Sequence, residues 1–241
     1  MSGHSKWATI KRQKGTADIK RGQQFTKLAN AIVIAVKQNG GNSDPESNFK
    51  LRLAIDKARS YNMPKDNIER AIVKAKGAGE SGDLLELLYE GFASGGAAVI
   101  IEAVTDNKQR TVSEVKNALE KNGGIMGNPG SVAYLFNRIG EIAVINHGKN
   151  ADELFEMAIE LNSNDYGEEE GDVVFYVDPA ALFASKKLLE SKGLSVASAE
   201  IVYKPLTPLE GNEELKTKVQ AVIEKLEDLA DVQNVFTNLS L

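Results

Sequence analysis

The feature that most constrains the fold of this chain is a change in hydrophobic spacing near residue 80. Before it, apolar residues in QQFTKLANAIVIAVKQ (23–38) recur every three or four positions, which is the spacing of one face of an α-helix. After it, β-rich runs such as AAVIIEAV (97–104) alternate with helical segments such as ADELFEMAIELN (151–162). The glycine-rich stretch GAGESGDLLE (77–86) lies between them and predicts a boundary. We therefore expect an α+β chain whose first third is helical.

Three helices are expected in that first third. The first covers 23–38 and ends at Gly40-Gly41. The second covers 45–61, because Ser43-Asp44 offers a cap and Pro45 suits a first-turn position. The third begins at Pro64 and ends at Gly77. Three short helices predict a small bundle with a basic exterior.

The remainder predicts two α/β sandwiches. Between 136 and 206 we expect the order strand, helix, strand, strand, helix, strand, with EIAVIN (141–146) as the first strand and 163–171 as a turn. This is the order of a ferredoxin-like split βαβ sandwich. A turn at Arg138-Ile139-Gly140 is expected to separate EIAVIN from a strand in SVAYLFNR (131–138). The flanking pieces would supply a second such unit if they close on each other. The predicted domains are 1–79, 80–135 together with 207–241, and 136–206, the last inserted into the middle one.

Charge is divided unevenly along the chain. The net charge is −5, yet residues 1–76 carry sixteen Lys and Arg against six Asp and Glu, and residues 77–241 carry thirteen against twenty-eight. Such asymmetry indicates a nucleic-acid or other anionic partner for the basic part. The alternative is that the Lys-rich helix faces are simply solvated.

The basic residues are densest in GHSKWATIKRQKGTADIKRG (3–22), where Asp18 is the lone acid. Cations at this density can follow phosphates, which provide affinity that does not depend on sequence. Trp7, the only tryptophan, could stack on an unpaired base or could instead anchor this stretch to the helices. The predicted nucleic-acid contacts are His4, Lys6, Trp7, Lys11, Arg12, Lys14, Lys20, Arg21 and Lys27.

The sequence offers little support for catalysis, a metal or a cofactor. There is no cysteine, and the two histidines, His4 and His147, lie far apart without ligand spacing. A G-x-G-x-x-G match at 77–82 follows a helix instead of a strand, so we interpret it as a hinge. The acidic cluster at 165–172 lacks the ligand pattern of a calcium loop and is interpreted as a solvated turn. We expect no enzyme, no cofactor, no small-molecule substrate and no membrane contact, and we expect a cytoplasmic location.

Several motifs together resemble one family. Gly3-His4-Ser5-Lys6-Trp7, IKRQKGTADIKRGQQFTKL (10–28) and MPKDNIERAI (63–72) are similar to the N-terminal domain of the YebC family, whose mitochondrial relative is the translational activator of cytochrome c oxidase. YEGF (89–92), VTDNKQRT (104–111) and GSVAYLF (130–136) are similar to the later motifs of that family. The resemblance implies an N-terminal helical domain followed by two α/β domains, and a non-enzymatic role in gene expression.

The resemblance leaves two kinds of nucleic-acid partner open. Family members are described as DNA-binding transcriptional regulators and as ribosome-associated factors that help translate difficult stretches such as proline runs. The third helix has Asp66 and Glu69 in its first turns, where a recognition helix would contact bases, so we favour rRNA or tRNA on the ribosome. DNA is the alternative. A scaffold that uses the acidic domains for protein contacts is a further possibility, and the oligomeric state is left open.

Overall fold

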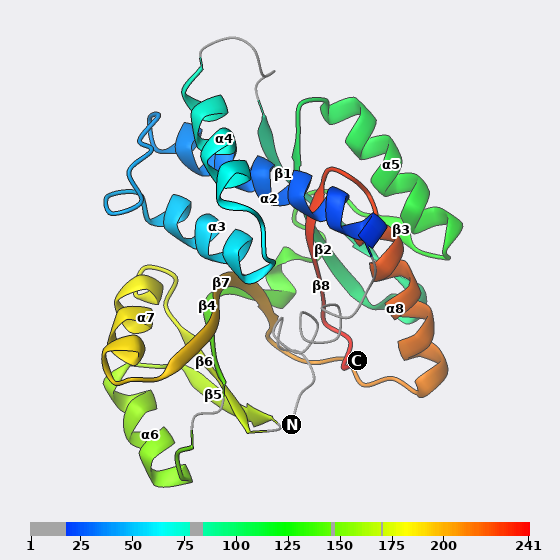
Figure 1. Cartoon of the computed structure of the whole chain (residues 1–241). Coiled ribbons are helices and arrows are strands. Elements are labelled where there is room, and N and C mark those ends of the chain that lie inside the picture. The colour runs from blue at the N-terminus through cyan, green and yellow to red at the C-terminus, as the bar shows by residue number, and fades with distance from the viewer. Residues whose placement is uncertain (1–17, 78–83, 146–147, 170) are drawn as a thin grey trace. The chain divides into compact units, whose positions relative to one another are not determined.

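The computed structural model describes residues 18–77, 84–145, 148–169 and 171–241, with backbone only for 18–21 and 169 (Figure 1). The chain divides into two compact units. The inserted unit is Asn137–Lys204, and the main unit comprises the described residues up to Phe136 together with Pro205–Leu241. The α-helices of the described residues are α2 (Asp18–Gln38), α3 (Phe49–Ser60), α4 (Lys65–Lys76), α5 (Lys108–Lys121), α6 (Ala151–Glu160), α7 (Leu182–Ser191) and α8 (Glu213–Glu227). The predicted division into three domains stays a prediction.

Helices α2, α3 and α4 share one apolar core in the main unit. Its members are spaced by three or four positions on each helix, as the sequence indicates. They include Leu28, Ile32, Val33 and Val36 of α2, Leu51, Ile55 and Ala58 of α3, and Ile68, Ala71 and Ala75 of α4. Expected and observed helices therefore agree in this region, apart from their ends.

The start of α3 differs from the expected position at residue 45. Asn48 caps the helix, because its side-chain oxygen accepts a hydrogen bond from the Leu51 amide at 3.1 Å. The Asn48 amide group also donates to the carbonyl oxygens of Ala35 (2.9 Å) and Asn42 (2.7 Å), and the residue is buried. Asn48 therefore fixes the helix start and its packing on α2 together, and the preceding residues at Pro45 form a turn.

The main unit contains a four-stranded sheet in the order β3-β1-β2-β8. Its strands are β1 (Leu85–Phe92), β2 (Ala98–Thr105), β3 (Ile125–Met126) and β8 (Val232–Thr237). The β1–β2, β1–β3 and β2–β8 pairs are antiparallel. The chain order is two strands, helix α5, a strand, then helix α8 and a strand. It therefore differs from the βαββαβ order that we expected for this part.

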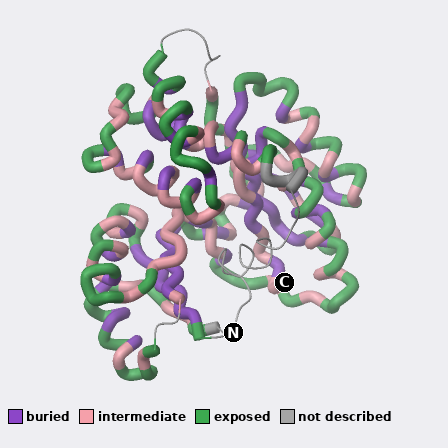
Figure 2. The backbone as a smooth tube through the Cα atoms, viewed as in Figure 1, coloured by how far each residue is buried: buried purple, intermediate pink, exposed green. Residues whose placement is uncertain are grey.

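Strand β2, in the middle of this sheet, is buried along almost its whole length (Figure 2). On one face, alternate residues Val99, Ile101 and Ala103 of β2 pack with Leu119 of α5 and Leu226 of α8. The residues between them point to the opposite face, where α2 crosses β2 (Figure 1). Ile100 is fully buried there, and its cross-strand partner Phe236 is 7% exposed. A strand buried on both faces explains the continuous apolar run AAVIIEAV.

The inserted unit contains the second sheet, in the order β5-β6-β4-β7. Its strands are β4 (Phe136–Ile145), β5 (Asp165–Glu169), β6 (Asp172–Val177) and β7 (Ser195–Pro205). With α6 after β4 and α7 after β6, the order is that of a split βαβ sandwich. Two local expectations were wrong here. Residues 165–169 form a strand paired with β6 instead of a turn.

The second wrong expectation is the turn at Arg138-Ile139-Gly140, since β4 runs straight through these residues. A Cβ at Gly140 would lie 3.1 Å from side-chain carbons of both Leu182 and Val177. The glycine therefore serves close packing of α7 against the strand and does not mark a reversal of the chain.

Candidate nucleic-acid interface

The predicted contact residues fall into three groups in the structure. His4, Lys6, Trp7, Lys11, Arg12 and Lys14 lie outside the described residues. Lys20 and Arg21 lie in the first turns of α2, where only the backbone is described. Lys27 is the one predicted contact whose side chain is described, and it is buried. The assignment of these nine residues to nucleic acid stays a prediction.

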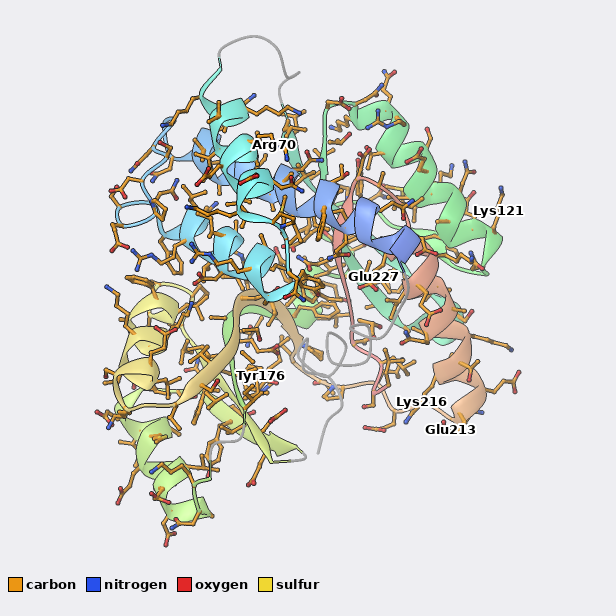
Figure 3. All side chains as sticks on the ribbon, viewed as in Figure 1. Arg70, Lys121, Tyr176, Glu213, Lys216 and Glu227 are labelled. Carbon is orange, nitrogen blue, oxygen red and sulfur yellow. The ribbon has the colours of Figure 1, made fainter. Side chains whose placement is uncertain are left out.

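Lys27 of α2 is 7% exposed and points into the main unit. Its ammonium group donates a hydrogen bond to the carbonyl oxygen of Glu227, the last residue of α8 (Figure 3). A buried ammonium needs such acceptors, because burial removes its water. The negative end of a helix also favours a cation. Lys27 therefore joins two helices in this structure, and we leave it out of the interface proposed below.

Two further polar links hold the helical region on the sheet of the main unit. The side chain of Gln38, at the end of α2, donates to Glu86 of β1 at 2.7 Å. Lys57 of α3 donates to the side-chain oxygen of Asn234 at 3.4 Å, and the Asn234 amide donates to Glu102 of β2 at 2.8 Å. The inner faces of α2 and α3 are therefore occupied within the protein, so a ligand must use their outer faces.

Helix α4 has the most exposed cations among the described helices of the first third, although Asp66 and Glu69 on it are exposed as well. Lys65, Arg70, Lys74 and Lys76 are all exposed. In its first half the charges are occupied locally: Lys65 lies 3.4 Å from Glu69, and Arg70 donates to the Asn67 side chain at 2.6 Å (Figure 3). The side-chain ammonium groups of Lys74 and Lys76 make no hydrogen bond or ion pair within the described part of the chain. The C-terminal half of α4 is therefore available to phosphates.

The VTDNKQRT motif forms a polar network centred on Asp231. The buried Asp231 carboxylate accepts hydrogen bonds from the hydroxyls of Thr111 (2.7 Å) and Thr105 (3.0 Å) and from the guanidinium of Arg110 (2.8 Å). Burial alone would raise the pKa of Asp231, but these donors outweigh it and hold the pKa below its usual value. The motif therefore joins β2 and α5 to the residue that precedes β8.

The YEGF and GSVAYLF motifs meet at Glu90 of β1. The Glu90 carboxylate is 6% exposed and accepts hydrogen bonds from three backbone amides, those of Gly130 (2.6 Å), Val132 (2.7 Å) and Ala133 (2.8 Å). Burial alone would raise the pKa of Glu90, but the three amides outweigh it, so the pKa is lowered. An acid in the middle of an apolar strand is a sequence signal that could have identified this anchor.

The described residues provide neither a metal-binding cluster nor a membrane-spanning helix. No group of three or more His, Cys, Asp or Glu residues there is placed to hold a metal ion. No helix in that part of the chain is both long and apolar enough to cross a membrane. The acidic cluster near 165 contributes instead to strand β5, where Asp165 pairs with Lys204 at 2.6 Å.

Comparisons with known proteins cover almost the whole chain. A family model described as the TACO1/YebC protein N-terminal domain matches residues 5–78, and one described as the TACO1/YebC second and third domain matches residues 84–239. A protein of Chloroflexus aurantiacus named "Probable transcriptional regulatory protein" is 45% identical over 245 residues, covering 100% of this chain and 96% of that protein. A protein of the same name from Pseudomonas fluorescens is 45% identical over 242 residues, with the same coverage.

A solved structure has the same fold. The crystal structure of a conserved hypothetical protein, Aq1575 from Aquifex aeolicus, matches with a TM-score of 0.87 and 41% identity, covering 98% of this chain and 96% of that one. Sequence and structure thus agree on the relatives of this chain.

Proposed function

The chain belongs to the TACO1/YebC family, and on that premise we propose that it is a nucleic-acid-binding regulator of gene expression without catalytic activity. The observation that carries the proposal is the division of charge. Sixteen Lys and Arg against six acids are gathered in the first 76 residues, and the remainder is acidic. Phosphates attract the first part and repel the second, so the protein binds with its N-terminal third.

The first candidate partner is structured RNA on the ribosome. Two features of α4 support it over a sequence-reading mode on DNA. Asp66 and Glu69 lie in the first half of the helix, and Lys65 and Arg70 there are engaged by neighbours on the same helix. A recognition helix reads base edges with its first residues, and these residues offer carboxylates. Lys74 and Lys76 instead suit contacts to the backbone of a folded RNA.

The second candidate is transcriptional control through DNA. The names of the relatives favour this candidate, since the Chloroflexus and Pseudomonas proteins are both named probable transcriptional regulatory proteins. It requires one promoter sequence to be bound far more tightly than random DNA, typically by a factor of about 10³ or more. A ribosome-bound factor has no such requirement.

Sedimentation of cell lysate through a sucrose gradient separates the two candidates. The native protein is compared with a Lys11→Glu, Arg12→Glu, Lys14→Glu variant at low and moderate salt. A matched control reverses three exposed lysines of the acidic part, Lys116→Glu, Lys218→Glu and Lys225→Glu. We expect the native protein and the control to travel with ribosomes and the first variant to stay at the top.

Two other sedimentation results would contradict this expectation. If all three proteins stay at the top and the native protein shifts one promoter fragment selectively, the RNA proposal is wrong and the DNA proposal replaces it. If all three travel with ribosomes equally, the basic N-terminal stretch is not the anchor.

A further inference from the structure

The segment Gly127–Leu135, here called the anchored loop, is held in one conformation by the main unit. Both carboxylate oxygens of Glu90 are used: one accepts from Gly130, and the other accepts from Val132 and Ala133. The Glu90 carbonyl oxygen also accepts a hydrogen bond from the Gly127 amide at 2.8 Å. Backbone and side chain of one strand residue thus fix both ends of the loop.

Close packing removes the remaining freedom of this segment. A Cβ at Gly127 would lie 2.3 Å from the Ser131 hydroxyl, and one at Gly91 would lie 2.7 Å from the carbonyl oxygen of Ile125. Only glycine fits at position 91, where the obstacle is backbone, whereas at position 127 the Ser131 side chain would have to turn aside. Val132 is fully buried and anchors the middle of the loop in the unit. The loop is therefore already ordered in the free protein, and binding a partner does not cost the entropy of ordering it.

The anchored loop displays one large side chain, that of Tyr134, which is 68% exposed. Tyr134 lies in the 3-10 turn Ala133–Leu135. Its neighbour Leu135 is fixed on both sides: the Leu135 amide donates to Val132, and the Leu135 carbonyl accepts from the Leu206 amide at 2.8 Å. The backbone that carries the ring is rigid while the ring itself extends into solvent.

We propose that Tyr134 is a stacking platform for an unpaired base of the nucleic acid whose phosphates the basic N-terminal third binds. The inference rests on the proposed function and adds a second contact to it, in the main unit. Stacking needs only one accessible face of the tyrosine ring on a fixed support. Every nucleic-acid base has a flat face that can stack on it. The 3-10 turn and its two hydrogen bonds supply that support.

A nucleic acid fits this loop better than a protein does. A protein hot spot places its aromatic anchor within a ring of surrounding contacts that exclude water. Of the exposed residues nearby, Asn128 and Gly130 offer no apolar side chain and only Pro129 and Leu206 (56% exposed) do, so the apolar rim around the ring is incomplete. The Asn128 side chain can instead donate to or accept from a base or a sugar.

The test measures binding of the full-length protein to a single-stranded, fluorescently labelled 30-nucleotide polyuridine RNA by anisotropy, over a series of salt concentrations. Tyr134→Ala should weaken binding by about 5- to 150-fold, the range for loss of one stacked base. Tyr134→Phe keeps the ring and should bind like the native protein. Phe155→Ala removes an aromatic of similar exposure (58%) from α6 of the inserted unit and should have no effect.

Salt dependence distinguishes this contact from phosphate binding. Because Tyr134 carries no charge, Tyr134→Ala should leave the slope of log affinity against log salt unchanged. The Lys11→Glu, Arg12→Glu, Lys14→Glu variant should flatten it. Tyr134 is exposed, so circular dichroism of the variants should match that of the native protein.

Three outcomes would overturn the inference. If Tyr134→Ala binds the RNA normally and the charge-reversed variant does not, Tyr134 is no platform, although the proposed function stands. If Tyr134→Ala binds RNA normally yet leaves the ribosome fractions, its partner is a protein. If the native protein does not bind this RNA but still travels with ribosomes, this inference fails while the proposed function stands.

Discussion

Removal of the Asp231 carboxylate gives a strong test of the polar network in the main unit. In Asp231→Ala, the Thr105 hydroxyl, which is 1% exposed, loses its acceptor, while Thr111 can still donate to the Asn107 carbonyl oxygen at 3.1 Å. Arg110 is half exposed and keeps Asp106 at 2.9 Å. One buried hydroxyl without an acceptor lowers the stability by about 1–3 kcal/mol. The lost hydrogen bonds to a charged acceptor raise the total loss of stability to about 3–5 kcal/mol.

The assay is native-state hydrogen exchange, because the chain has two compact units and a single unfolding transition cannot be assumed for it. Amides of β2 and β8 report on the unit that contains Asp231, and amides of β6 in the inserted unit serve as the internal reference. A loss of 3–5 kcal/mol accelerates the slowest exchange by roughly two to three and a half orders of magnitude. Exchange in β6 should not change.

The effect has a defined dependence on pH. The pKa of Asp231 is lowered in the folded protein, so its stabilisation is present above the usual carboxyl value of 3.8 and is lost as the pH falls through the lowered folded value. The native protein and Asp231→Ala should therefore differ fully at neutral pH, and the difference should shrink as the pH falls below 3.8 toward the lowered folded pKa. Asp106→Ala, an exposed partner of Arg110, should cost less than about 1 kcal/mol. Equal effects of Asp231→Ala and Asp106→Ala at pH 7 would refute the reasoning.

Four further substitutions have expected outcomes. Gly91→Ala should destabilise the main unit by about 1–3 kcal/mol, since its Cβ would meet backbone at 2.7 Å, whereas Gly22→Ala, whose Cβ on helix α2 would meet nothing, should stabilise it by about 0.5–1 kcal/mol; hydrogen exchange of the β2 amides compares the two. Lys27→Gln should lower stability by about 1–3 kcal/mol in the same exchange measurement and leave the salt slope of RNA binding unchanged, because its ammonium is buried; a flatter slope would contradict that placement. Glu90→Gln should cost about 1–3 kcal/mol at pH 7, and because the folded pKa of Glu90 is lowered, the difference should shrink as the pH falls below its usual value of 4.5 toward the folded value; a difference that grows in acid would contradict the sign.

The helices of the first third follow directly from local sequence, and their ends do not. The spacing of Leu28, Ile32 and Val36 identifies α2 because the same side chains form its core. The start of α3 depends on Asn48, whose amide group reaches Ala35 thirteen positions earlier. A pattern of neighbouring residues cannot show a contact over that separation in the sequence. The same limit applies to Gly140, which resembles a turn residue until the packing of Leu182 against it is known.

Contacts between distant segments explain what sequence could not predict about the candidate site. Lys27 lies in a basic stretch and resembles a surface cation, but its acceptor is 200 positions away. Glu90 and Thr111 carried a better signal, since a charge within an apolar strand and a polar motif next to one both suggest buried anchors. The cations of α4 were visible in the sequence, and the structure adds which of them are already engaged by their neighbours.

The position of β8 also constrains how this protein folds during its synthesis. Strand β2 pairs with β1 close by in the chain, but its other edge pairs with residues 232–237, which are synthesised more than 120 residues after β2. The strands of the inserted unit lie within 136–205, so that unit can complete its sheet while the main unit is still open. During synthesis the apolar edge of β2 is exposed to other nascent chains, and a protein cut short before β8 keeps that edge. Termination before β8 should therefore yield aggregates, and a chaperone is most useful while the residues between β2 and β8 are being made.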